Sequence, residues 1–132
     1  MEYKKIISQA TNQSRKNVAK KLNLENLHSL DRMCFMIGPE LAEILERAGI
    51  RVERIGYALG SIRHEFMKLR VPNSRQFYLL DHSYLQFVDP KLRIGLPSVI
   101  FVPIQSAQQI ARTLSNHRIP KKYHIIWLSK LF

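Results

Sequence analysis

The sequence predicts an α/β (α+β) fold: one small domain with a mixed sheet and about three helices. The first observation is that two apolar runs flank a helical pattern in residues 31–56, with glycine and proline at the joints. The second is a later series of branched and aromatic runs separated by turn signals, which is typical of strands. The third is the length of 132 residues with 45% hydrophobic residues, which favours a single domain over residues 1–132.

The joints of residues 31–56 predict a strand–helix–strand unit. Residues 33–37 form a continuous apolar run, short enough for a strand that is buried on both faces. Pro39 follows Gly38 at the expected first helical position, where its missing N–H costs nothing. Gly49 is the expected left-handed stop, and residues 50–55 then alternate with the period of a strand. The predicted helix has one apolar face, made of Leu41, Ile44, Leu45 and Ala48.

Residues 1–30 mix basic and apolar side chains. We expect a helix over residues 14–22, whereas residues 1–13 could form a loosely held arm. The spacing of the cations in this helix is compatible with a phosphate-binding patch or, more simply, with a solvated helix face. These cations are expected largely on the solvent side: Arg15, Lys16, Lys20 and Lys21.

The middle of the chain predicts strands. Gly56 and Gly60 lie four residues apart, which indicates a bulge or a close backbone approach. Residues 62–71 alternate imperfectly, which predicts a strand interrupted by a bulge. Residues 76–89 leave two alternatives open: an aromatic-rich hairpin that turns at residues 81–83, which we favour, or an amphipathic helix.

The last third of the chain predicts an edge strand, a capped helix and an apolar end. Residues 98–104 are expected to form a strand that Pro103 confines to a sheet edge. Ser106 and Gln109 have the spacing of a capping box, S-x-x-Q, which predicts a helix that begins there. Residues 125–128 are expected to form a final strand or an apolar tail.

The charge of the chain indicates an anionic partner. There are 21 Lys and Arg residues against 10 Asp and Glu residues, a formal charge of +11. The partner could be nucleic acid, an acidic protein or an anionic membrane surface; the alternative is a basic surface that is only solvated. Aromatic residues lie among the basic clusters, so rings could stack on unpaired bases while cations contact phosphates. The candidate anion-binding residues are Arg15, Lys16, Lys20, Lys21, Arg118, Lys121 and Lys122.

Signatures of catalysis and metal binding are weak. No phosphate-binding glycine loop, nucleophile elbow or zinc-protease motif occurs in the sequence. His64, Asp81 and His82 could do acid–base chemistry, but we expect them at surface or turn positions. The scattered histidines predict no metal site. The single cysteine, Cys34, excludes an internal disulfide and is expected to be a buried, unreactive thiol.

The sequence has no targeting or membrane signal of a recognisable kind. No apolar run approaches the roughly 18 residues that a membrane-spanning helix needs. The first residues lack the apolar core and small-residue cleavage site of a signal peptide. We therefore expect a cytoplasmic protein without a membrane span.

Residues 43–56 read EILERAGIRVERIG. This segment resembles the phrase ILxRAGIxVxRIG in acyl-homoserine-lactone synthases and the related N-acyl amino acid synthases. Both belong to the N-acetyltransferase (GNAT) superfamily. The resemblance extends over residues 27–71, about a third of the chain, and corresponds to the C-terminal half of those enzymes.

The resemblance implies a GNAT-type, acyltransferase-like domain that recognises an acyl carrier protein or acyl-CoA, with or without catalysis. The catalytic acid and donor-orienting arginines of that family precede the matched unit. Residues before Asp31 do not reproduce them, so the resemblance assigns no catalytic residue and requires no further cofactor. A basic docking surface would suit an acidic carrier protein, and a second subunit could complete the activity. The alternative is a small basic module that binds nucleic acid or acts in a larger assembly.

Overall fold

The computed structural model describes residues 2–21 and 34–132. Apart from three short 3₁₀ helices, the regular structure of these residues consists of α-helices and one antiparallel sheet of order β1-β2-β3-β4. The strands are β1 (Arg51–Leu59), β2 (Ile62–Arg70), β3 (Phe77–Asp81) and β4 (Ile100–Pro103). The α-helices are α1 (Glu2–Lys21), α2 (Cys34–Arg47), α3 (Ala107–Asn116) and α4 (Ile125–Leu131).

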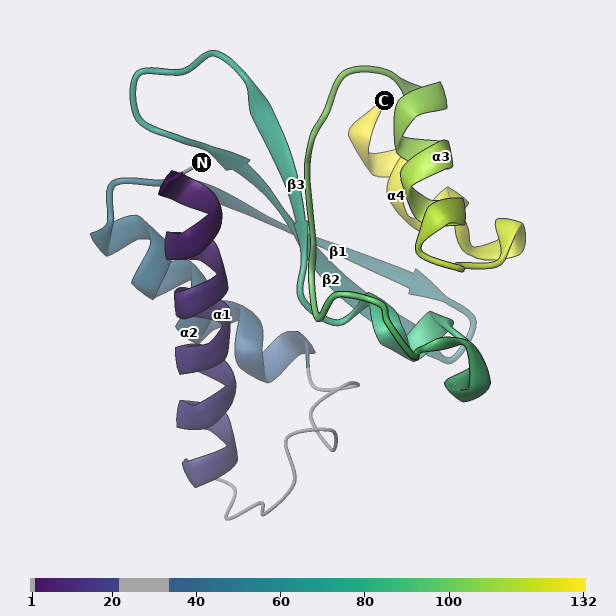
Figure 1. Ribbon diagram of the computed structural model, residues 1–132, viewed down its shortest axis with the longest axis horizontal. Helices are drawn as coiled ribbons and strands as arrows, with labels where there is room; N and C mark the ends of the chain where they lie inside the picture. Colours follow the sequence, from purple (N-terminus) through teal and green to yellow (C-terminus); the bar gives the residue numbers. More distant parts are fainter. Residues whose placement is uncertain (1, 22–33) are drawn as a thin grey trace.

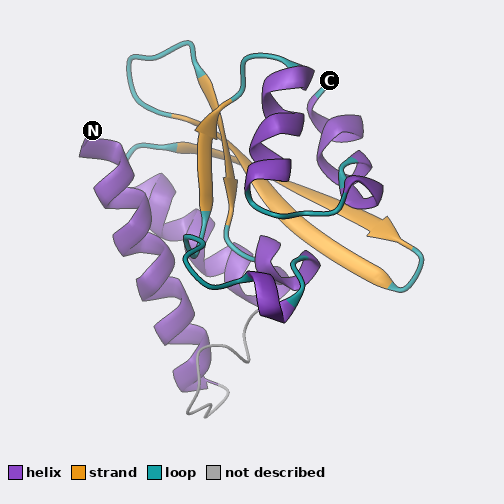
Figure 2. Cartoon of the chain, turned by 45° about the vertical axis from the view of Figure 1, so that its right-hand side comes forward, coloured by secondary structure: helices purple, strands orange, loops and turns teal. Residues whose placement is uncertain are grey.

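The sheet lies between two helical layers. Helices α1 and α2 cover one face, and α3 and α4 lie on the other face (Figure 1, Figure 2). The predicted α+β class is confirmed. The prediction of a mixed sheet is wrong, because each of the three strand pairings is antiparallel. β1 and β2 are longer than β3 and β4, and the turn end of the β1–β2 hairpin extends past the two shorter strands (Figure 1).

Helix α1 includes most of the segment that the sequence left open as a loose arm. Ile7 and Ala10 are buried in the core with Val18, at helical spacing. The two polar residues on the same face hydrogen-bond to their own helix. Thr11 Oγ1 donates to the Ile7 carbonyl at 2.8 Å, and Ser14 Oγ donates to the Thr11 carbonyl at 2.8 Å. The arm interpretation is therefore wrong for residues 2–13.

Helix α2 starts where the sequence predicted a strand. Ile37, at the end of the 33–37 run, lies on one helical face with Leu41 and Leu45, and all three are completely buried. Met36 is 46% exposed, which a strand buried on both faces would not allow. Pro39 lies inside the helix, so its predicted place at the first helical position is wrong. There it lacks the N–H that would donate to the carbonyl four residues earlier. The predicted strand–helix–strand unit is thus a helix followed by a strand.

Three local predictions concern this region: a left-handed stop, strand bulges and a buried thiol. Gly49 has φ +84° after α2, so the left-handed stop is confirmed. The β1–β2 register runs without interruption from Arg51↔Arg70 to Leu59↔Ile62, so the predicted bulges are absent from this pair. Gly60, with φ +60°, instead turns the hairpin. The side chain of Cys34 lies outside the described part of the structure.

Residues 76–89, for which the sequence leaves a hairpin and a helix open, form a strand followed by a helical turn. The first part is β3, and the chain then forms a short 3₁₀ helix, η2 (Tyr84–Phe87). Tyr84, Phe87 and Val88 are buried against the core that α3 and α4 share with the sheet. The aromatic residues therefore belong to a strand and to a helical turn, and the favoured hairpin is wrong.

The last third confirms the edge strand and the helix cap. Pro103 ends β4, the outer strand next to β3. Ser106 Oγ accepts from the Gln109 backbone N–H at 3.1 Å, as a capping box requires, while Gln109 Oε1 accepts from Gln105 N at 3.2 Å. Residues 125–128 belong to the helix α4, so the expected strand or tail is wrong.

A partly buried ion pair limits how closely α2 approaches the sheet. Arg54 Nε donates to Glu65 Oε1 at 2.5 Å and Arg54 Nη2 donates to Oε2 at 3.0 Å, a bidentate pair. The Glu65 side chain is only 4% exposed, and its carboxylate lies against Gly38 of α2. A Cβ added at Gly38 would overlap Glu65 Oε1. Only glycine fits at this position while the ion pair is in place.

We therefore expect Gly38→Ala to destabilise the protein by about 1–3 kcal/mol, as overpacking does. At an open helical position the same change would stabilise by about 1 kcal/mol, so the sign is informative. The coupling free energy between Gly38 and Glu65 can be measured by urea unfolding of four proteins. These are the parent, Gly38→Ala, Glu65→Ala and the double variant. In the double variant the methyl group has room, and Gly38→Ala should lose its destabilising effect. Additive effects would contradict the proposed overlap.

Candidate functional site

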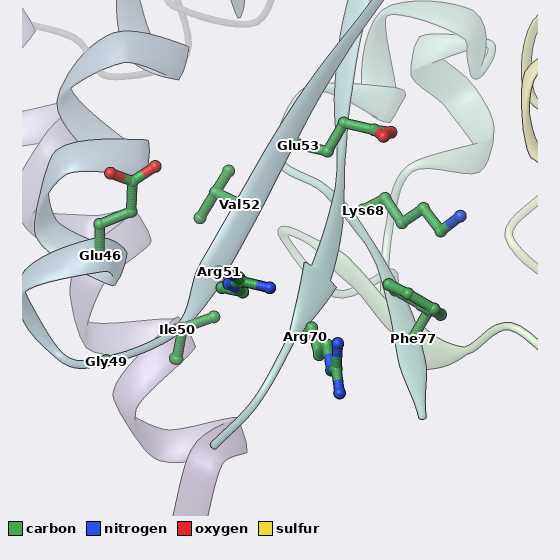
Figure 3. Close-up of a pocket in the computed structure, with 9 residues that line it drawn as sticks. All are labelled: Glu46, Gly49, Ile50, Arg51, Val52, Glu53, Lys68, Arg70 and Phe77. Carbon is green, nitrogen blue, oxygen red and sulfur yellow. The ribbon is translucent and has the colours of Figure 1, made fainter. Parts of the chain in front are cut away.

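A solvent-exposed hollow lies at the end of the sheet where β1 begins and β2 ends. It has a volume of about 570 Å³, and an adjoining hollow of about 500 Å³ shares Gly49, Arg51 and Arg70 with it. We call the two together the basic groove, defined by Arg51, Lys68, Arg70, Arg75 and Phe77. Other residues that line the first hollow are Glu46, Gly49, Ile50, Val52 and Glu53 (Figure 3).

The strand register places the groove side chains in rows. Arg51 of β1 pairs with Arg70 of β2, and Arg70 pairs with Phe77 of β3. Directly opposed residues project from the same face of a sheet with neighbouring Cβ atoms. Figure 3 shows Arg51 and Arg70 on the same side of the hairpin, with Phe77 next to them. Two positive charges directly opposite each other repel, so this row is electrostatically unfavourable without an anion.

The neighbours of the two arginines leave most of their charge available. Arg70 Nε donates to the Ser74 carbonyl at 3.0 Å, which orients the guanidinium without neutralising it. Within residues 2–21 and 34–132, no carboxylate forms an ion pair with Arg51 or Arg70. The second hollow is lined by Arg51, Arg70 and Arg75 and by no acidic residue. This end of the groove is therefore strongly positive.

The first hollow adds an aromatic ring and moderates the charge. Phe77 is 40% exposed, and Lys68 Nζ lies 4.3 Å from its ring centroid, a cation–π contact. Glu53 pairs with Lys68 in the register, and Glu46 also lines this hollow. The groove thus changes from arginine-rich to mixed and partly aromatic along its length.

The cations predicted on α1 have three different environments. Arg15 is buried, contrary to the prediction of a solvent-facing side chain, and its Nη2 donates to the His82 carbonyl at 2.6 Å. Lys21 forms an ion pair with Glu40 of α2, which lowers the pKa of the Glu40 carboxyl through their hydrogen bond. Lys16 and Lys20 are exposed. Arg15 and Lys21 therefore make contacts within the fold. Lys16 and Lys20 face solvent, and neither forms an ion pair with another described residue.

The second predicted cluster lies across the sheet from α1. Arg118 has φ +62° after α3, and its Nη1 donates to the carbonyls of Leu92 and Ile94. Lys121 and Lys122 are exposed in the 3₁₀ helix η4 (Lys121–Tyr123), with Lys122 Nζ 5.0 Å from the Tyr123 ring centroid. Because α1 and α3 cover opposite faces, the fold does not bring the two predicted clusters together (Figure 1).

None of the residues that define the basic groove was among the predicted anion-binding residues. The sequence signal exists: Arg51, Lys68 and Arg70 occupy alternate positions in strands that were expected. Alternation assigns each cation to one face of its own strand. It does not say which residue of the next strand lies opposite, and that register is what pairs Arg51 with Arg70.

A buried polar network connects β2, β3 and α4 under the helices. His64 Nε2 and Asp81 Oδ2 are 2.6 Å apart, and Trp127 Nε1 donates to the same oxygen at 2.8 Å. The Ser83 backbone N–H donates to Asp81 Oδ1 at 3.0 Å. The other ring nitrogen of His64, Nδ1, lies 2.7 Å from Gln86 Nε2. Both ring nitrogens of His64 thus have partners within the fold.

The network is structural in its geometry. His64, Asp81 and Trp127 are each completely buried, so the prediction of surface or turn positions for His64 and Asp81 is wrong. Burial by itself raises the pKa of the Asp81 carboxyl, but the charge and hydrogen bond of His64 outweigh burial and hold this pKa below its usual value. Asp81 is therefore the buried anion that attaches α4 to the sheet through Trp127.

His82 is buried beside this network without hydrogen bonds to its ring. Its exposed fraction is 0%, and within residues 2–21 and 34–132 neither Nδ1 nor Nε2 has a hydrogen-bond partner. Burial lowers the pKa of His82 to about 4, and the attraction of Asp81 does not compensate. The imidazole is consequently neutral in the folded protein, and the predicted surface or turn position of His82 is wrong as well.

We expect this histidine to make the fold sensitive to mild acid. The folded pKa of about 4 lies below the ordinary value of 6.5, so the unfolded chain takes up the proton first as the pH falls. Stability is complete above pH 6.5 and is lost between pH 6.5 and 4, by about 3 kcal/mol at 1.36 kcal/mol per pKa unit. Urea unfolding at pH 7 and at pH 4.5 should show this loss in the parent. His82→Phe should flatten it, and an unchanged pH profile in the variant would contradict the assignment.

Neither a metal site nor a known relative points to a function for the described part of the chain. Among the described residues, no group of three or more His, Cys, Asp or Glu side chains could hold a metal ion. None of the described helices combines the length and apolarity that crossing a bilayer requires. Comparison with known proteins gives no match to a protein-family model, to a curated protein or to a solved structure.

Proposed function

We propose that the chain is a binding module for an anionic polymer and that its preferred ligand is single-stranded nucleic acid held in the basic groove. The observation that carries the proposal is the pair Arg51 and Arg70, opposed across β1 and β2 next to the exposed ring of Phe77. A bound phosphate between the guanidinium groups would relieve their repulsion.

The groove chemistry suits an unpaired strand better than a duplex. Guanidinium groups bind phosphate oxygens in a bidentate manner, while aromatic side chains stack on bases that are not paired. Phe77 already contacts Lys68 on its ring, and it remains 40% exposed. Arg75 extends the positive charge along the second hollow, which supports a ligand longer than one nucleotide.

A second candidate is an acyl carrier protein or acyl-CoA docked in the same groove. It is favoured by one observation: residues 43–56, which resemble acyltransferases, contribute Glu46, Gly49 and Arg51 to the groove wall. An acidic carrier surface or the phosphates of coenzyme A would be attracted to the same arginines. A GNAT-type acyltransferase-like role, with or without a second subunit, therefore remains a proposal for this surface.

The test is a titration of labelled single-stranded RNA and DNA against matched charge variants. Arg51→Gln/Arg70→Gln removes two cations from the groove, and Lys16→Gln/Lys20→Gln removes two from α1 on the other side. We expect the groove variant to bind at least about tenfold more weakly, because two charge-assisted contacts are lost. Its log K against log salt slope should fall by about 1.4 for two phosphates. Phe77→Leu should weaken binding without changing the slope.

Three outcomes separate the proposals. Equal losses in the groove and α1 variants would mean that the whole basic surface attracts nucleic acid, and would overturn the groove site. Binding of acyl carrier protein or acyl-CoA that requires Arg51 and Arg70, without nucleic-acid binding, would favour the second candidate. Unchanged affinity of the groove variant for each of these ligands would overturn both.

A further inference from the structure

The loop between η2 and β4 carries the most exposed apolar side chain of the described residues. It begins with the 3₁₀ helix η3 (Pro90–Leu92) and continues to residue 97. Ile94 is 83% exposed and Leu92 is 47% exposed. An isolated exposed apolar residue is ordinary in proteins, but two in one projecting loop form a potential contact.

The fold holds this loop in place through its backbone. Arg118 Nη1 donates to the carbonyls of Leu92 and Ile94, the latter at 3.2 Å. Arg93 Nε donates to the Val88 carbonyl at 3.1 Å, and the Asp89 carboxylate caps the Lys91 N–H at 3.0 Å. Three of these bonds end on backbone carbonyls and one on the Asp89 carboxylate. The side chains of Leu92 and Ile94 take no part in them and stay exposed on an anchored loop.

The surroundings of the two apolar side chains are mainly positive. Lys91 and Arg93 lie beside Leu92 in the chain, and Arg118 contacts the loop directly. Lys121 and Lys122 follow within four residues of Arg118 and are exposed. The nearest acidic residue along the loop is Asp89. Apolar tips among cations are the composition that binds an anionic bilayer surface, where the apolar groups enter the headgroup layer.

We propose that this loop is a membrane contact, in which Leu92 and Ile94 insert into the surface of an anionic lipid bilayer while the surrounding cations contact lipid headgroups. A projecting tip suits a soft bilayer, whereas a protein partner would have to supply a matching pocket. The contact is peripheral, in keeping with the absence of a spanning helix among the described residues. The proposal is independent of the basic groove, which lies at the other end of the β1–β2 hairpin.

The test is co-sedimentation of the full chain with vesicles of phosphatidylcholine alone and with 30% phosphatidylserine. We expect binding to the anionic vesicles only, and Leu92→Ser/Ile94→Ser should lower the partition coefficient about tenfold or more. Met36→Ser is the matched control, because Met36 is 46% exposed on α2 at the opposite face. Lys121→Gln/Lys122→Gln should also weaken binding and reduce its salt dependence.

Several results would overturn the membrane contact. Equal binding to neutral and anionic vesicles would show that the cations do not contribute to membrane binding. Unchanged binding of Leu92→Ser/Ile94→Ser would show that the two apolar side chains of the loop do not enter the bilayer. If the parent binds neither vesicle but a soluble acidic protein protects Ile94 from solvent in hydrogen exchange of residues 90–97, the surface is a protein contact and the membrane proposal is wrong.

Discussion

The burial of β2 on both faces is the constraint on which the rest of this structure depends. Met67 and Leu69 pack toward α1 and α2, while Phe66 packs toward α3 and α4. A strand covered on both sides must satisfy every polar group that it carries, because water cannot reach them. β2 carries two such groups, His64 and Glu65, one on each face.

Each of these groups has a partner that also positions a helix. Glu65 pairs with Arg54 of β1, and its carboxylate sets the approach of α2 at Gly38. His64 pairs with Asp81 of β3, whose carboxylate also accepts from Trp127 of α4. Removing one member of a buried charged pair leaves the other uncompensated, so these contacts specify the arrangement of the layers more than they add stability. His82, whose ring has no hydrogen-bond partner among the described residues, is the exception and is the expected source of acid sensitivity.

The two proposed binding surfaces lie where this layered core stops. The basic groove lies at the open end of the β1–β2 hairpin, opposite its turn, where Arg51 and Arg70 lie beside Phe77. The apolar loop around Ile94 lies next to the C-terminal end of α3, where Arg118 holds it. The buried residues His64 and Asp81 belong to neither surface, because they hydrogen-bond to other residues of the core. The two proposed surfaces and the buried core therefore contain separate sets of charged residues.

The sequence by itself determined the features whose cause is local. The left-handed stop at Gly49, the cap at Ser106 and the end of the edge strand at Pro103 each follow from the backbone chemistry of one or two residues. The excess of positive charge is also a property of the sequence alone.

Only the tertiary structure decided the rest. Residues 34–37 could extend as a strand or continue the apolar face of a helix, and packing of Ile37 with Leu41 chose the helix. His64, Asp81 and Trp127 are far apart in the chain, and no local pattern marks them as one buried network. The pairing of Arg51 with Arg70 depends on strand register, and a shift by one residue would turn one arginine to the opposite face. Local chemistry sets where elements begin and end, whereas the site depends on contacts between elements that only the folded chain defines.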